Sequence, residues 1–115
     1  MKHDQLYLIR PDFLDQGKGP YFCPGCAQMV GLLDYYPTLK QHLDVCLVDY
    51  QRPRPALVKL LGEENQSCPV LILGTKPQGL PTDIKVLSAN GRCFIDDVTS
   101  IANYLAHVHS IGIPH

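Results

Sequence analysis

Hydrophobic residues along the chain fall into short apolar runs, which alternate with segments whose apolar positions recur at helical spacing. The apolar runs predict four strands, at 6–9, 45–48, 69–73 and 93–95. Helical spacing, bounded by proline or glycine, predicts three helices, at about 24–36, 56–61 and 98–108. The segment 12–20 is a loop by composition, and 84–87 is a candidate for a brief extra strand. The predicted order is therefore β-α-β-α-β-β-α.

This order predicts how the strands pair. Because a helix joins the first two strands, they should be parallel with a right-handed crossover, whereas the last two should form an antiparallel pair. The nearly all-apolar strand 45–48 is typical of a strand covered on both faces. The predicted fold class is α/β, a four-stranded mixed sheet with helices on both faces. With 115 residues, the chain is expected to form one domain, 1–115.

A Cys-Pro-Gly-Cys motif opens the first predicted helix, with Cys23 and Cys26 at its two ends. Pro24 suits the first turn of a helix because it has no amide hydrogen to leave unpaired, which puts Cys23 at or next to the N-cap. The helix dipole and the free amide hydrogens at that end favour a thiolate. We therefore expect Cys23 to be the more exposed cysteine and the nucleophile, and Cys26 to resolve the mixed disulfide.

The cysteine count and the charge narrow the class of protein. There are five cysteines, an odd number, and the first residues contain no apolar signal-peptide region. We therefore expect a cytoplasmic protein whose cysteines are not a disulfide framework. Cys46 and Cys93 lie in apolar runs and are expected in the core. The net charge of −1, without a basic cluster or a long apolar stretch, predicts neither a nucleic-acid partner nor a membrane partner.

The same cysteines allow a second chemistry, metal binding. Two cysteines at this spacing are often half of a structural zinc site, which normally needs four ligands. Cys68 precedes Pro69 in a loop-like context, and the bond between them is a plausible cis site. Three interpretations of Cys68 therefore remain. It could be a small apolar residue packed beside Pro69, or a third thiol that diverts the Cys23 disulfide. It could also be a third ligand, with Cys23 and Cys26, for zinc or another thiophilic metal.

The order of these features resembles the thioredoxin superfamily, and its glutaredoxin-like branch fits best. The features are the Cys-Pro-Gly-Cys helix, Cys68-Pro69 before a strand, and the final strand and helix, over about 6–109. The resemblance implies a thioredoxin-like fold in which the two cysteines open the first helix and a cis-proline loop packs against them. Pro69 stands at the matching position, so the resemblance places Cys68 beside Cys23.

The segment 97–105 resembles the end of glutathione-transferase amino-terminal domains. In those domains an acid followed by serine holds the γ-glutamyl end of glutathione. Asp97 matches the acid, and Val98 replaces the serine; either Asp96 or Asp97 can also cap the last helix. In glutaredoxin-like proteins, basic groups near the second helix meet the glycine carboxylate. The resemblance thus implies glutathione as a possible, loosely bound cofactor, with contacts at Arg54, Cys68 and Asp97.

More narrowly, the chain resembles a family of short, uncharacterised bacterial thioredoxin-like proteins. The resemblance is carried by Cys-x-x-Cys-Ala, by the run Arg-Pro-Arg-Pro at 52–55 and by the segment 62–71. Two hypotheses remain. One is a thiol–disulfide oxidoreductase with a redox-active disulfide at Cys23 and Cys26, acting on a protein or a low-molecular-weight thiol or disulfide. The other is a non-catalytic metal-binding or partner-binding module that uses Cys23, Cys26 and Cys68.

Overall fold

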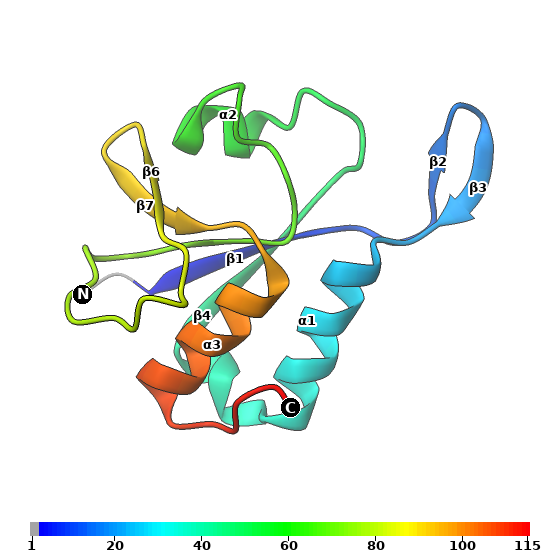
Figure 1. The fold of residues 1–115 in the computed structure, drawn as a ribbon. Helices are drawn as coiled ribbons and strands as arrows, with labels where there is room; N and C mark the ends of the chain where they lie inside the picture. Colours follow the sequence, from blue (N-terminus) through cyan, green and yellow to red (C-terminus); the bar gives the residue numbers. More distant parts are fainter. Residues whose placement is uncertain (1–2) are drawn as a thin grey trace.

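A five-stranded sheet forms the centre of the molecule in the computed structural model, which describes residues 3–115 (Figure 1). Its strand order is β4-β1-β5-β7-β6. These strands are β1 (Asp4–Ile9), β4 (Leu43–Val48), β5 (Val70–Ile72), β6 (Leu87–Ala89) and β7 (Arg92–Ile95). β1 pairs with β4 in parallel, while β5 is antiparallel to both β1 and β7. The predicted mixed α/β class and the predicted strand directions are confirmed.

The predicted number of strands was wrong, because β6 adds a fifth strand. β6 pairs with β7 through a tight turn at Asn90 and Gly91, whose φ angles are 51° and 72°. A turn with two positive φ angles matches the twist of a hairpin, so it extends pairing on both sides, starting with Ala89 opposite Arg92. The extra strand expected at 84–87 therefore lies later in the chain, directly before this turn.

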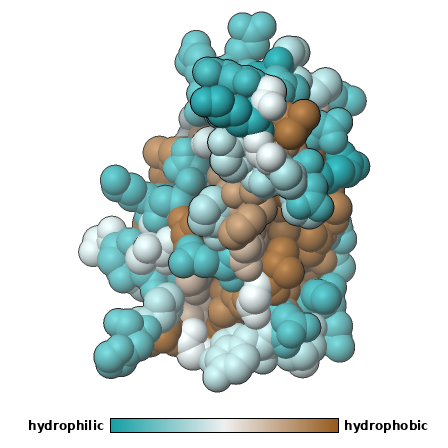
Figure 2. Space-filling model, turned by 90° about the vertical axis from the view of Figure 1, so that its right-hand side faces the viewer, coloured by the Kyte–Doolittle hydropathy of each residue, from teal (hydrophilic) through white to brown (hydrophobic). Residues whose placement is uncertain are grey.

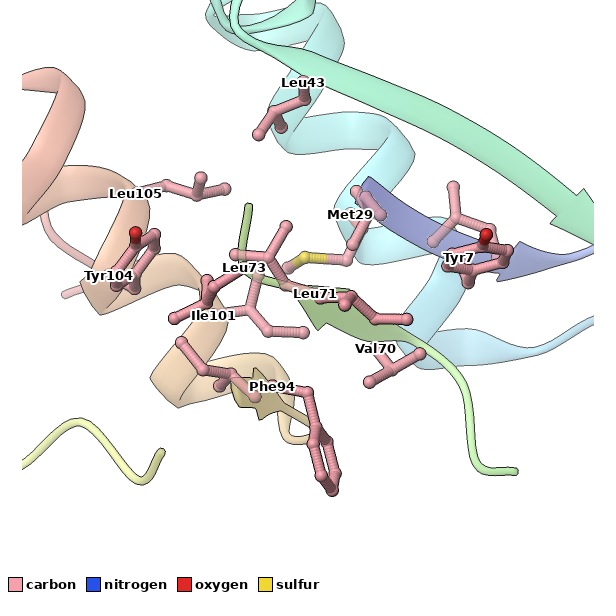
Figure 3. Packing of buried hydrophobic residues seen from close by; sticks show 14 of the residues in the cluster. Tyr7, Met29, Leu43, Val70, Leu71, Leu73, Phe94, Ile101, Tyr104 and Leu105 are labelled. Atoms are coloured by element: carbon pink, nitrogen blue, oxygen red, sulfur yellow. The ribbon is translucent and has the colours of Figure 1, made fainter. Parts of the chain in front are cut away.

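Helices cover both faces of the sheet, as predicted. α1 (Pro24–Tyr35) and α3 (Val98–His109) lie side by side on one face, and α2 (Pro55–Leu61) lies on the other (Figure 1). A 3-10 helix, η1 (Pro37–Gln41), follows α1. Met29 of α1 and Ile101 and Leu105 of α3 converge on Leu71 and Leu73, in and just after β5 (Figure 3). None of the helices in the described part of the chain is both long and apolar enough to span a bilayer.

The segment between β1 and α1 is a β-hairpin, where a loop was predicted. It consists of β2 (Phe13–Asp15) and β3 (Lys18–Tyr21) and projects from the sheet (Figure 1). Gln16 and Gly17 form its turn with positive φ angles of 53° and 74°. The Phe13 ring stacks on Tyr50, with centroids 4.1 Å apart and planes 5° apart. This aromatic contact joins residues that are distant in sequence and stabilises the hairpin. The composition of the segment alone predicts a loop.

Three apolar positions predicted to be covered are exposed. Val45 and Leu47 in β4 are 41% and 50% exposed, and Val108 near the end of α3 is 46% exposed. β4 is one of the two edge strands of the sheet, so it has a neighbouring strand on one side only, and less of its surface is covered. The expected cover on both faces of 45–48 was therefore wrong, and so was the inward position of Val108.

A pair of histidines links the end of α3 to the segment before β4. The His109 ring stacks on His42 with centroids 4.8 Å apart, and His109 Nε2 is buried without a hydrogen-bond partner among residues 3–115. Burial lowers the pKa of His109, and the neighbouring His42 lowers it further, while Asp4 opposes this shift. The folded state therefore favours neutral His109.

Acidification should consequently destabilise the protein through His109. Its folded-state pKa lies below the unfolded value, so its contribution is complete above an unfolded pKa of about 6.5 and is lost as the pH falls below it. We expect His109→Phe to reduce the loss of unfolding free energy between about pH 7.5 and pH 5, measured by urea denaturation. His107→Phe, at an exposed position of the same helix, is the matched control. Equal pH dependence in the two variants would contradict this role of His109.

Candidate functional site

Cys23 caps the amino terminus of α1. Its backbone is extended, with φ −81° and ψ 114°, and Pro24 takes the first helical position. The Cys23 sulfur accepts a hydrogen bond from the Cys26 amide at 3.2 Å, and the Cys23 carbonyl accepts one from the Ala27 amide at 3.0 Å. A sulfur thus stands where a serine or aspartate oxygen usually caps a helix. Cys23 is half-buried, so the capping sulfur remains accessible.

Cys26 lies one helical turn deeper and is hidden. Its side chain is buried, and its sulfur accepts a hydrogen bond from the Ile9 amide, at the end of β1, at 3.4 Å. Burial raises the pKa of Cys26 to about 12, with a further contribution from its hydrogen bond to Cys23. Cys26 is therefore a thiol at neutral pH, although the Ile9 amide would stabilise negative charge on its sulfur. The two cysteines therefore differ in exposure: Cys23 is half-buried and Cys26 is buried, as the sequence predicted.

The loop before β5 packs directly against the motif. The Cys68–Pro69 peptide bond is cis, and the Cys23 thiol lies 3.9 Å from the Cys68 carbonyl oxygen, to which it donates. A Cβ atom on Gly25 would lie 3.1 Å from Pro69 Cδ and 3.1 Å from Val98 Cγ2. Three distant segments therefore meet here: the starts of α1 and α3 and the loop before β5. A side chain at this position would therefore require Pro69 or Val98 to shift by a few tenths of an ångström.

Arg54 lies behind this loop and is only 4% exposed. Its Nε and Nη2 groups donate to the Tyr50 carbonyl at 3.1 and 2.6 Å, and Nη1 donates to the Gln66 carbonyl. The Arg54 amide donates to Gln66 Oε1 at 2.7 Å, and the guanidinium carbon lies 5.6 Å from the centre of the Tyr50 ring. Arg54 therefore joins the segment before α2 to the loop that carries Cys68, and its side chain does not reach the surface.

The Cys68 thiol is affected by both the motif and Arg54. Burial raises the pKa of Cys68 to about 11. The positive charge of the Arg54 guanidinium opposes this rise in pKa, whereas the proximity of Cys23 adds to it. Cys68 also contributes to the raised pKa of Cys26. Cys68 therefore belongs to the same site as Cys23 and Cys26.

A family model described as "Protein of unknown function (DUF3088)" matches residues 3–113. The chain belongs to this family. The matched range includes the motif, Arg54, the Cys68–Pro69 loop and the start of α3. Membership of a family of unknown function confirms the expectation of an uncharacterised family. Comparisons with curated proteins and with solved structures gave no match.

In this DUF3088 member, Asp97 caps α3. One carboxylate oxygen of Asp97 accepts a hydrogen bond from the Ser100 amide at 2.8 Å, as its position at the helix start predicts. The next residue, Val98, is the one whose methyl group faces Gly25. Asp97 therefore lies at the edge of the site, with one oxygen already engaged inside the fold.

Three other residues that lie at this candidate site were not predicted to be part of it. Gln66 and Tyr50 hold Arg54 through their carbonyl oxygens, and Val98 contacts the motif. No pattern in the sequence marks Gln66 or Tyr50, because backbone carbonyls serve as acceptors in every residue type.

The structure shows all five cysteines as free thiols. Within residues 3–115, no group of three or more His, Cys, Asp or Glu side chains is arranged to hold a metal ion.

Proposed function

We propose that this protein is a thiol–disulfide oxidoreductase with a thioredoxin-like fold of the glutaredoxin-like branch. The observation that carries the proposal is the arrangement of the motif: half-buried Cys23 at the N-cap of α1, with buried Cys26 one turn deeper. The packing of Pro69 against Gly25 supports it, because the resemblance implies a proline loop at this place. β6 and the β2–β3 hairpin are additions to the predicted framework.

The proposed reaction has two exchanges. The Cys23 thiolate attacks one sulfur of a substrate disulfide, and the other substrate sulfur leaves as a thiol after taking up a proton. Cys26 then loses its proton and attacks Cys23, which releases the second substrate thiol and leaves a Cys23–Cys26 disulfide. The hydrogen bond from the Ile9 amide stabilises the charge that develops on Cys26 as its proton leaves. Pro69 shapes the surface on which the backbone of the partner rests.

The exposed aromatic residues before Cys23 suit a partly apolar partner surface. Tyr21 and Phe22, directly before Cys23, are 45% and 61% exposed. The face that carries the hairpin and α1 is hydrophilic at the top, and below this hydrophobic residues are exposed among hydrophilic and neutral ones (Figure 2). Arg54 is buried, so it would engage glutathione only after rearrangement, whereas half-buried Asp97 uses one carboxylate oxygen to cap α3. Both a protein disulfide and a small disulfide therefore belong in the test.

The experiment traps the mixed disulfide and identifies it by mass spectrometry. The two probes are a disulfide-containing peptide and oxidised glutathione. Cys26→Ser/Cys68→Ser should accumulate an adduct at Cys23, whereas Cys23→Ser/Cys68→Ser should form none at Cys26. Cys68 is replaced in both variants because a third thiol beside Cys23 would release the adduct by exchange. Equal amounts of adduct in the two variants would contradict the assignment.

Elemental analysis separates this proposal from the alternative, a non-catalytic metal-binding or partner-binding module. The protein is purified without chelator, and its metal content is compared with that of Cys23→Ser/Cys26→Ser. The proposal predicts no stoichiometric metal and a reversible Cys23–Cys26 disulfide. One equivalent of zinc that depends on Cys23 and Cys26 would instead favour the metal-binding module.

A further inference from the structure

A buried arginine without an acidic partner lies at the back of the site. The ion pairs among residues 3–115 are His3–Asp44 and Arg10–Asp49, so Arg54 has no carboxylate partner in this range. Its guanidinium is nevertheless 4% exposed and permanently charged. Burial of a charge is unfavourable unless an opposite charge or several hydrogen bonds compensate it. The carbonyls of Tyr50 and Gln66 compensate only in part, because they carry no net charge.

The backbone position makes this placement still less favourable. Arg54 is the N-cap of α2, and its side chain makes no capping hydrogen bond. The amino-terminal end of a helix is the positive end of its dipole, which disfavours a cation. Arg54 is therefore unfavourable in two ways: its charge is buried without an opposite charge, and it lies at the positive end of a helix. Residues that violate local preferences are concentrated at functional sites, where their charge can act on another group.

The guanidinium donates to the Gln66 carbonyl, two residues before Cys68, and the Cys68 carbonyl oxygen lies 3.9 Å from the Cys23 sulfur. The charge of Arg54 also lowers the pKa of the Cys68 thiol. We propose that Cys68 is a third redox-active cysteine of the site, and that Arg54 positions its sulfur and stabilises its thiolate. Cys68 would then accept the disulfide from the motif, forming a Cys23–Cys68 disulfide. This inference rests on the proposed oxidoreductase function and extends it to a second intramolecular exchange.

The exchange balances without an external oxidant. In the oxidised motif, the Cys68 thiolate attacks the Cys23 sulfur, a Cys23–Cys68 bond forms and the Cys23–Cys26 bond breaks. Cys26 leaves as a thiolate and takes up the proton that Cys68 released, by way of solvent. One disulfide and one thiol are present before and after the step. Cys26 stays protonated at neutral pH because its burial raises its pKa to about 12.

Oxidation of Cys23 is what should make Cys68 reactive. Burial and the proximity of Cys23 favour the neutral Cys68 thiol, while the charges of Arg54 and Arg52 oppose them. Once Cys23 is part of a disulfide, its sulfur is an electrophile that a Cys68 thiolate can attack, which the reduced protein does not offer. Arg54 and Arg52 favour that thiolate. Cys68 should therefore take part in no disulfide exchange in the reduced protein, and should react only after Cys23 has formed a disulfide.

The first test uses Cys26→Ser, with oxidised glutathione as the probe. We expect glutathione to join Cys23 and then to be displaced by Cys68, so that a peptide map shows a Cys23–Cys68 disulfide as the main product. In Cys26→Ser/Cys68→Ser the adduct should persist. Cys26→Ser/Cys93→Ser, which removes a thiol outside the site, should behave like Cys26→Ser. An adduct that persists equally in Cys26→Ser and Cys26→Ser/Cys68→Ser would overturn the inference and leave the proposed function intact.

The second test examines Arg54 through the pH profile of Cys68 alkylation, read by site-resolved mass spectrometry in Cys23→Ser/Cys26→Ser. With both serines in place, the charged groups that act on Cys68 are Arg54 and Arg52. Loss of an adjacent cation raises the pKa of an acid by about one unit or more. Arg54→Gln should therefore slow alkylation below the midpoint by about tenfold, and Arg54→Lys should restore part of the rate. Lys59→Gln, at an exposed position of α2, is the control and should change nothing.

The two tests separate the possible failures. If Arg54→Gln does not fold, as judged by circular dichroism, the first test still decides, because it keeps Arg54. An unchanged profile in folded Arg54→Gln would overturn the role of Arg54. Absence of any adduct at Cys23 in both variants of the first test would contradict the proposed function and, with it, this inference.

Discussion

Replacement of Leu71 by alanine is expected to lower the free energy of unfolding by about 2–5 kcal/mol. Leu71 lies in β5, opposite Leu6 on one side and Ile95 on the other, and is 0% exposed. α1 and α3 cover this side chain (Figure 3). Truncation therefore removes apolar contacts and leaves a cavity that the surrounding helices can close only in part. Urea denaturation measures the loss directly.

Leu47→Ala in β4 is the matched control for Leu71→Ala. Both positions are strand leucines, but Leu47 is 50% exposed at the edge of the sheet. Its truncation should cost about 1 kcal/mol or less. If both faces of strand 45–48 were covered, the two substitutions should lower the free energy of unfolding by similar amounts. Equal decreases would therefore contradict the exposure of Leu47 at the edge of the sheet.

The framework of the fold was predictable because each of its signals is local. Pro24 inside a helix start, Gly62 at a helix end and the Asn90–Gly91 turn each have a backbone preference that the structure follows. The capping position of Cys23 follows from Pro24 in the same way. These residues specify where elements begin and end without reference to the rest of the chain.

The features that were not predicted depend on contacts between distant segments. The order of strands in the sheet decides that Leu47 is exposed, and its apolar character cannot indicate this. Phe13 holds the hairpin through Tyr50, a residue beyond α1 and β4. Arg54 was expected to contact glutathione because the resemblance implies basic groups near the second helix. Arginines are usually exposed, and the burial of Arg54 depends on the carbonyls of Tyr50 and Gln66. Sequence therefore predicted the cysteines of the site better than the residues that surround them.

Gly25→Ala tests the contact that joins the motif to the Pro69 loop. A Cβ at this position would lie 3.1 Å from atoms of both Pro69 and Val98. The proline ring cannot rotate away as a flexible side chain would, so the loop or α1 must shift by a few tenths of an ångström. We expect the unfolding free energy to fall by about 1 kcal/mol or more, even though alanine favours a helix over glycine. The rate of thiol–disulfide exchange should fall by about tenfold, because Cys23 and the partner surface at Pro69 move apart.

Gly31→Ala provides the comparison within the same helix. Gly31 is exposed, and a Cβ there would meet no atom within 4 Å. It should stabilise the protein by about 0.5–1 kcal/mol through helix propensity alone and leave the exchange rate unchanged. The two substitutions are chemically identical, so the difference between them isolates the contact with Pro69. If Gly25→Ala and Gly31→Ala have equal stability and equal exchange rates, the Pro69 loop does not press on the motif as described. Opposite signs in stability, with a slower rate only at Gly25, would tie the packing of this loop to the reactivity of Cys23.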